Sequence, residues 1–115
     1  MIFIDLLNEL QNLQKQLSNS LKQLRTNGIK LAEAERDYKI AVNKKALELR
    51  SNDTPVTLIN QIIYGYEDIA ELRFLRDSAE VVYSANKEAI NTLKLQIRIV
   101  QNQLDKEWNN AGKDY

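Results

Sequence analysis

Residues that interrupt secondary structure are scarce in this chain of 115 residues. It contains three Gly and one Pro, at positions 28, 55, 65 and 112. Because Gly and Pro are the strongest breakers of regular structure, the segments between them must form long uninterrupted elements. Apolar residues in these segments recur at alternating spacings of three and four, without the alternation of period two that marks strands. The chain is therefore expected to be all-α.

The spacing predicts a single domain over residues 1–115, with helices over residues 3–50, 55–64 and 66–109. Residues 110–115 are expected to fray. Two apolar stripes of about 40 residues joined by a short connector predict an elongated antiparallel helical hairpin of coiled-coil type, about 60 to 70 Å long. Folding the chain about residue 59 pairs Leu49 with Ile69, Gly28 with Ile90, and Leu10 with Trp108.

The first long helix has two irregular points. Leu13, Leu17 and Leu21 are spaced four apart, which is a stutter in a heptad repeat. Asn27-Gly28 is a dipeptide that favours turns, so two interpretations stay open: a separate N-terminal helix, or one continuous helix with Gly28 as a close-packing position. The apolar stripe runs through Gly28 in phase, which favours continuity.

The connector carries its own start and stop signals. Thr54 followed by Pro55 is typical of an N-cap with Pro at the first helical position, where its missing N–H is not needed. Gly65 suits a left-handed residue that ends the short helix.

Apolar residues also occur off the main stripes. Leu95 and Ile99 are four apart and lie on a second face of the last helix. They predict a second seam that joins two copies into a four-helix bundle, because one long hairpin has little core. The alternative is that they are scattered surface residues, which are normal.

Composition excludes several classes of function. The chain has no His and no Cys, so thiolate and imidazole metal sites, disulfides and Ser-His-Asp or Cys-His nucleophiles are absent. Sixteen basic residues balance 16 acidic ones, which argues against a generic nucleic-acid binder. No segment has the roughly 18 apolar residues that cross a bilayer, and the N-terminus lacks the pattern of a signal peptide. We expect a cytoplasmic, non-enzymatic protein with no catalytic residues, metal, cofactor or membrane partner.

Carboxylates cluster where the last helix begins. Glu67, Asp68 and Glu71 resemble the first half of the metal motif of all-α nucleotide pyrophosphatases, in which carboxylates on one helix face hold Mg²⁺. The second half requires an acidic pair three residues apart, but here Glu88 is followed by Asn91. Solvated carboxylates at a helix N-terminus explain the cluster better, and a Mg-dependent enzyme is a remote alternative.

Aromatic, apolar and Arg side chains gather in and after the connector, and these types anchor protein interfaces. They predict a partner-binding tip formed by Val56, Ile59, Ile63, Tyr64, Tyr66, Arg73, Phe74 and Arg76. In the alternative, basic side chains at the tip grip nucleic-acid phosphates while aromatic rings stack on bases. The residues for that role are Lys44, Lys45, Arg50, Arg73 and Arg76. Interspersed acidic residues favour protein binding.

Five short segments between Leu31 and Trp108 carry a resemblance: Leu31–Tyr38 (LAEAERDY), Pro55–Ile59 (PVTLI), Ala70–Phe74 (AELRF), Arg76–Val81 without Ser78, and Glu88–Asn91 (EAIN). This part of the chain resembles a family of small helical early-region proteins of Gram-positive phages and prophages. That family usually has a charged stretch after the short helix, whereas Ile62–Tyr66 is apolar and aromatic here.

The resemblance implies a phage protein in the cytoplasm of an infected bacterium, and it carries over no activity. In such a setting a protein-binding tip would dock onto a host defence effector, such as a CRISPR nuclease, or onto a phage recombination or replication enzyme. This is an analogy with other small early phage proteins. The expected partners are a second copy of the chain and a host or phage protein.

Overall fold

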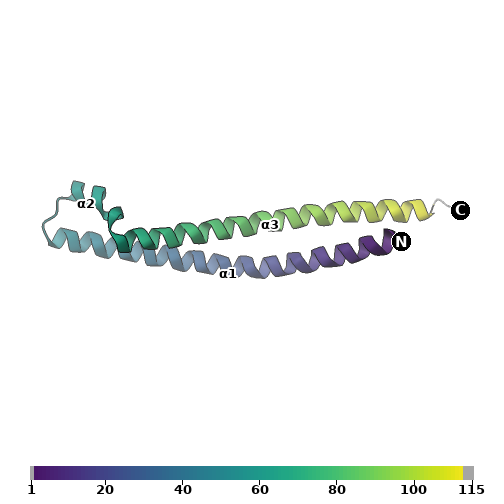
Figure 1. Ribbon diagram of the computed structural model, residues 1–115, viewed down its shortest axis with the longest axis horizontal. Coiled ribbons are helices and arrows are strands. Elements are labelled where there is room, and N and C mark those ends of the chain that lie inside the picture. The colour runs from purple at the N-terminus through teal and green to yellow at the C-terminus, as the bar shows by residue number, and fades with distance from the viewer. Residues whose placement is uncertain (1, 113–115) are drawn as a thin grey trace. The chain divides into compact units, whose positions relative to one another are not determined.

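The fold was obtained as a computed structural model that describes residues 2–112, and it confirms an all-α helical hairpin (Figure 1). Helix α1 spans Ile2–Ser51, α2 spans Val56–Ile62, a short 3-10 turn (η1) spans Ile63–Gly65, and α3 spans Glu67–Gly112. The described residues include no strand. None of the described helices has a stretch apolar enough, over the necessary length, to cross a bilayer.

The chain divides into two compact units, each built from a stretch of both long helices. The end unit comprises Met1–Arg25 and Ala85–Tyr115, and the connector unit comprises Thr26–Ser84. Within each unit the stretch of α1 runs antiparallel to the stretch of α3 (Figure 1).

The core of the end unit follows the predicted apolar stripes. Leu13, Leu93 and Val100 are buried, and further apolar residues pack around them: Leu6, Leu10, Leu17, Ile97 and Leu104. The predicted stutter was wrong, because Leu21 is exposed and Ser20 is half-buried instead, which keeps the regular steps of three and four. The backbone carbonyl of Ser20 accepts a hydrogen bond of 3.1 Å from the side-chain amide of Asn86. A polar layer therefore occupies the place where a leucine layer was expected.

The connector is the segment between α1 and α3, residues 52–66, which contains α2 and η1. The core of the connector unit forms where this segment folds back on α1. Leu49 of α1, Ile59 of α2 and Ile63 of η1 are buried together. Half-buried apolar residues surround them: Val42, Ala46, Ile62 and Tyr66. The connector thus fills the layer at Leu49 that Ile69 was expected to fill.

This fold-back changes how the two long helices are aligned, and the predicted pairing was wrong. A Cβ added to Gly28 would lie 3.4 Å from the Tyr83 ring, whereas Ile90 was expected there. The ring of Trp108 lies against Phe3 rather than Leu10, with 6.2 Å between ring centroids. Both differences equal one heptad, so the same helix faces meet but the layers are shifted.

Helix α1 is continuous through Asn27-Gly28, as the phase of its stripe indicated. It ends in a Schellman motif, in which the N–H of Thr54 donates to the Leu49 carbonyl and the N–H of Asp53 donates to that of Arg50, both at 3.0 Å. Asp53 has the left-handed φ of 62° that this motif requires.

Two predictions about the connector were wrong. Pro55 itself stands at the N-cap position of α2, and no side chain caps that helix, because Thr54 completes the end of α1 instead. Gly65 does not have a positive φ, since the chain leaves α2 through a 3-10 turn and not a left-handed residue. Helix α3 also continues to Gly112, so residues 110–112 are helical, and residues 113–115 lie outside the described part.

Candidate protein-binding site

The connector is held rigidly by its buried residues. Ile59 is 5% exposed and Ile63 is 3% exposed, and both pack on Leu49. Ile59 and Ile63 were predicted to contact a partner, but their burial makes them core residues instead. Their role is to fix α2 and η1 on the end of α1, so that the outward side chains of the connector have defined positions.

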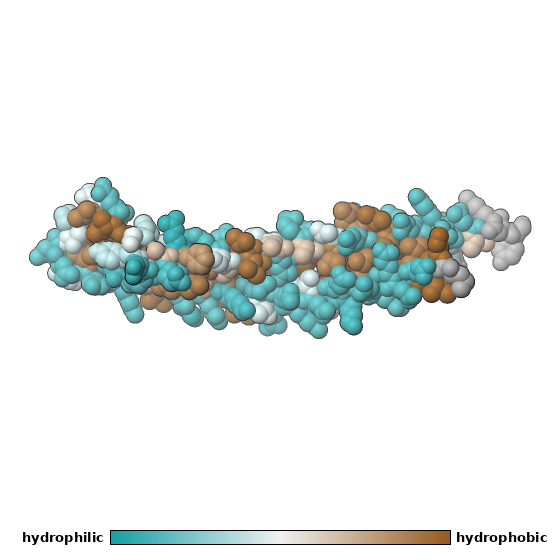
Figure 2. Space-filling view, viewed as in Figure 1, coloured by the Kyte–Doolittle hydropathy of each residue, from teal (hydrophilic) through white to brown (hydrophobic). Residues whose placement is uncertain are grey.

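The outward side chains include large apolar and aromatic groups. Val56 and Tyr64 of the connector and Phe74 of α3 are each about half exposed or more. Arg73, the exposed neighbour of Phe74 in sequence, lies over the Tyr64 ring. Figure 2 shows hydrophobic side chains on the outside of the connector, among hydrophilic neighbours. Leu58 is also exposed, and the sequence interpretation omitted it. Spacing gives no signal for its exposure, because Leu58 precedes the half-buried Ile62 by four residues and so lies on a similar helix face.

Three cationic side chains of this unit lie over tyrosine rings. The distances from cation to ring centroid are 5.6 Å for Arg73 over Tyr64, 4.7 Å for Lys45 over Tyr66, and 4.6 Å for Arg76 over Tyr38. Such contacts contribute roughly 0.5–1 kcal/mol each at exposed sites. Both tyrosines and three of the five cations predicted for the tip are therefore paired within the chain, and Arg76 pairs with Tyr38, which the sequence did not suggest.

Two of these cations also have carboxylate partners. The Lys45 ammonium lies 3.3 Å from Asp68, and Arg76 donates hydrogen bonds of 3.0 and 2.7 Å to one oxygen of Asp77. The bond to Asp77 raises the pKa of Arg76, against a smaller opposing effect of desolvation.

These pairs weaken the nucleic-acid alternative. Lys45, Arg73 and Arg76 each lie over a tyrosine ring of their own chain, whereas Lys44 and Arg50 lie over no ring within residues 2–112. The connector unit has eight basic and ten acidic residues, a net charge of −2. Phosphate binding favours the opposite sign.

The acidic cluster does not form a metal centre in the structure. Glu67, Asp68 and Glu71 border an open, shallow hollow on the first turns of α3. Within residues 2–112, no three acidic, His or Cys side chains come together in an arrangement that could hold a metal ion. Glu88 and Asn91 are both exposed on α3.

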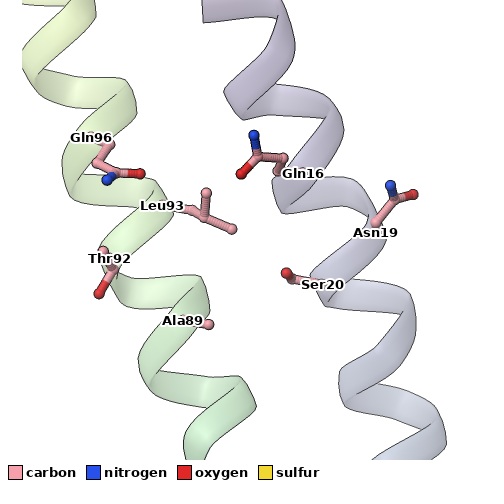
Figure 3. A pocket seen from close by; sticks show the side chains of 7 residues that line it. All are labelled: Gln16, Asn19, Ser20, Ala89, Thr92, Leu93 and Gln96. Carbon is pink, nitrogen blue, oxygen red and sulfur yellow. The ribbon is translucent and has the colours of Figure 1, made fainter.

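The end unit contains an open groove of about 500 Å³ between the two helices (Figure 3). Its lining combines amides, hydroxyls and small or apolar groups: Gln16, Asn19, Ser20, Ala89, Thr92, Leu93 and Gln96. Figure 3 shows Leu93 pointing toward α1 and Ser20 pointing toward α3. None of these side chains is charged or ionises near neutral pH, so the lining supplies no general acid or base.

Leu95 and Ile99, the predicted oligomer seam, are each about half exposed on α3. The fold and the site together define an all-α helical hairpin with an anchored, partly apolar connector. The chain matches no protein-family model, no curated protein sequence and no solved structure.

Proposed function

We propose that this chain is a non-enzymatic accessory protein that binds another protein through its connector. The observation that carries the proposal is the combination of a buried anchor, Ile59 and Ile63, with outward Val56, Leu58 and Tyr64. Exposed apolar groups on a rigid support lose little conformational entropy on binding, which favours affinity. Tyr and Arg, which stack together here as Tyr64 and Arg73, are the commonest anchors of protein interfaces.

Protein binding agrees better with the charge of this surface than nucleic-acid binding does. A protein partner needs a desolvated apolar centre with a polar rim, and the connector has apolar side chains bordered by Arg73 and by the carboxylates of Glu67 and Asp68. A nucleic acid would instead require cations free to meet phosphates.

The resemblance to early-region phage proteins supports a partner in the cytoplasm of an infected bacterium. Two kinds of partner fit that setting: a host defence effector, which the chain would inhibit as an anti-CRISPR protein does, or a phage recombination or replication enzyme, which it would assist. Both are bound without any chemistry by the chain, in agreement with the absence of His and Cys from its sequence.

The test is affinity capture from phage-infected cells with wild-type chain, the double variant Tyr64→Ala with Arg73→Ala, and Trp108→Ala. Trp108 is a matched control because it is an exposed aromatic residue of the other unit. We expect the double variant to lose a partner that wild type and Trp108→Ala both retain. Equal capture by all three proteins would show that the connector is not the binding surface.

A further inference from the structure

The first half of α3, which belongs to the connector unit, has an exposed apolar face. Its large members are Phe74, Leu75, Val81 and Val82, and each is about half exposed or more. These two adjacent pairs are seven residues apart, so they lie on one side of the helix. We call this side the outer face, and it comprises Glu67, Glu71, Phe74, Leu75, Ser78, Val81 and Val82. Large apolar side chains gathered on one exposed helix face mark a contact surface for another molecule.

The connector does not cover the outer face. Arg73 lies over the ring of Tyr64, and Tyr64 borders a hollow with Val42 of α1. Val82 borders a different hollow, with Lys30 of α1. By their heptad positions, Val42 and Lys30 flank the seam between the two helices on opposite sides. The connector therefore packs on one side of the unit, and the outer face borders the other.

The outer face has a negative charge of its own. Glu67 and Glu71 lie at its start, and both are exposed and form no ion pair within residues 2–112. Residues 67–84 contain two arginines, but neither lies on the face. Arg73 is turned to the connector and Arg76 to the seam, each over a tyrosine ring. The charged groups of the face itself are thus both carboxylates.

The charged residues around the face do not change its sign. Asp68 is paired with Lys45 at 3.3 Å, and Asp77 is paired with Arg76 at 2.7 Å. Glu80 lies on the side of α3 that is turned to the connector. The α1 residues that border the face by heptad position cancel one another in charge: Lys30, Glu33, Asp37 and Lys44. The outer face is therefore negative, within a unit that carries a net charge of −2.

We propose that the outer face binds an amphipathic helix of a partner protein. The apolar stripe of that helix contacts the four large apolar side chains, and Lys or Arg side chains beside the stripe meet Glu67 and Glu71. Recognition of this kind uses apolar anchors at helical spacing, and opposite charges fix the alignment. The proposal goes beyond the proposed function, because the exposed connector residues Val56 and Tyr64 do not belong to the face. It assigns Phe74, which the sequence suggested for the tip, to this second surface.

Other occupants fit the outer face less well. A second copy that used the same face would bring further carboxylates, and no cation, to Glu67 and Glu71. Nucleic acids and anionic lipid headgroups have the same sign of charge as the face, so they would be repelled. A basic amphipathic helix matches both the apolar side chains and the carboxylates.

Two labelled peptides of about 18 residues, long enough to span the face as helices, test the proposal. Both carry leucines at spacings of three and four, but the Lys peptide has lysines beside the leucine stripe and the Glu peptide has glutamates there. We expect fluorescence anisotropy to show that the wild-type chain binds the Lys peptide, and binds the Glu peptide about tenfold more weakly or worse. Backbone amide NMR shifts caused by the Lys peptide should concentrate in residues 67–84.

Charge reversal on the face should exchange the two peptides. We expect Glu67→Lys with Glu71→Lys to bind the Glu peptide more tightly than the Lys peptide, which a misfolded variant could not do. The matched control is Asp5→Lys with Glu9→Lys, because these two carboxylates are exposed on α1 in the end unit. It should keep the wild-type preference.

Removal of apolar groups tests the other half of the contact. Phe74→Ser with Val81→Ser should weaken binding of the Lys peptide by about tenfold or more, as loss of apolar anchors does at interfaces. Leu95→Ser with Ile99→Ser is the matched control, since these residues are exposed on α3 in the end unit. Tyr64→Ala should also retain binding, which separates the outer face from the connector surface.

Several results would overturn the proposal. They are equal binding of the two peptides, no binding of the Lys peptide, or a preference that charge reversal leaves unchanged. A wild-type mass of twice 13.3 kDa that falls to 13.3 kDa in Phe74→Ser with Val81→Ser would show that a second copy covers the face. Binding to phosphatidylserine vesicles that the same variant loses would assign the face to lipid.

Discussion

Asp53 ends helix α1 in the left-handed conformation, with φ of 62°. This conformation is about 1–2 kcal/mol less favourable than the right-handed one for most L-residues. The difference is smaller for Asp, and it is absent for Gly, which has no Cβ. We expect Asp53→Gly to raise the free energy of unfolding by about 0.5–1 kcal/mol, as measured by thermal denaturation. The matched control is Asn52→Gly, at a position without positive φ, which should give no gain. A lower stability for Asp53→Gly would mean that its side chain contributes more than its backbone strain costs.

Asn86 is the one buried polar residue of the described core. Its amide donates to the Ser20 carbonyl, and this hydrogen bond forms only when these two positions face each other. A polar residue in an otherwise apolar seam usually fixes the alignment of the helices at some cost in stability. Asn86 therefore helps to fix the register of α1 against α3, which apolar layers alone would not specify.

Asn86→Asp tests this role. The carboxylate cannot donate to the Ser20 carbonyl and loses hydration on burial, so we expect a loss of at least about 2 kcal/mol at neutral pH. Burial would raise the pKa of this carboxyl in the folded state above its unfolded value of about 3.9. The variant should then be most stable below about pH 4 and lose stability as the pH rises above that value.

The control for this pH dependence is Asn91→Asp, an exposed position on the same helix. It should show no comparable loss between pH 4 and pH 7 when both variants are followed by thermal denaturation. Similar pH profiles for Asn86→Asp and Asn91→Asp would contradict a buried hydrogen-bonded role for Asn86.

At the scale of elements, the sequence was sufficient for the long helices but not for their alignment. Spacing of three and four places residues on helix faces, and it gave α1 and α3 to within about three residues at each end. It could not give the register, because a shift of one heptad keeps every apolar residue on the seam. The shift depends on Ile59 and Ile63 folding back onto Leu49, which is a tertiary contact.

The same limit applied to the candidate site. The connector has apolar residues at five of the eight positions from Val56 to Ile63, so composition alone could not separate buried from exposed members. The structure buries Ile59 and Ile63 and exposes Val56 and Leu58. The types of residue at the tip were predictable, whereas their division between anchor and surface required the fold.

Ile63→Ala tests whether the connector is anchored as described. Removing most of a side chain that is 3% exposed should cost about 2–5 kcal/mol. We expect amide hydrogen exchange to accelerate in α2 and η1, while the end unit keeps its protection. Val56→Ala is the matched control, since Val56 is exposed, and it should leave exchange unchanged. Uniform acceleration along the whole chain would instead indicate that the connector does not open separately.

On the scale of the whole chain, positive and negative charges balance, but they do not balance within each unit. The net charge is zero, but the connector unit carries −2, and the remaining residues carry eight basic and six acidic groups, a charge of +2. The chain as a whole therefore has no long-range attraction to a polyanion, and the connector unit, with its net negative charge, repels one. This distribution disfavours nucleic acid at the tip.

We expect no retardation of duplex DNA or single-stranded RNA by the wild-type chain at about 0.15 M salt. Any weak binding at lower salt should come from basic residues spread over the whole chain, so the double variant Lys44→Glu with Arg50→Glu should not abolish it. The matched control is Lys94→Glu with Arg98→Glu, which reverses two basic residues of the end unit. Retardation that survives this control, is lost in the Lys44 and Arg50 variant, and weakens steeply with salt would contradict the prediction. That result would indicate that the connector binds a nucleic acid and not a protein.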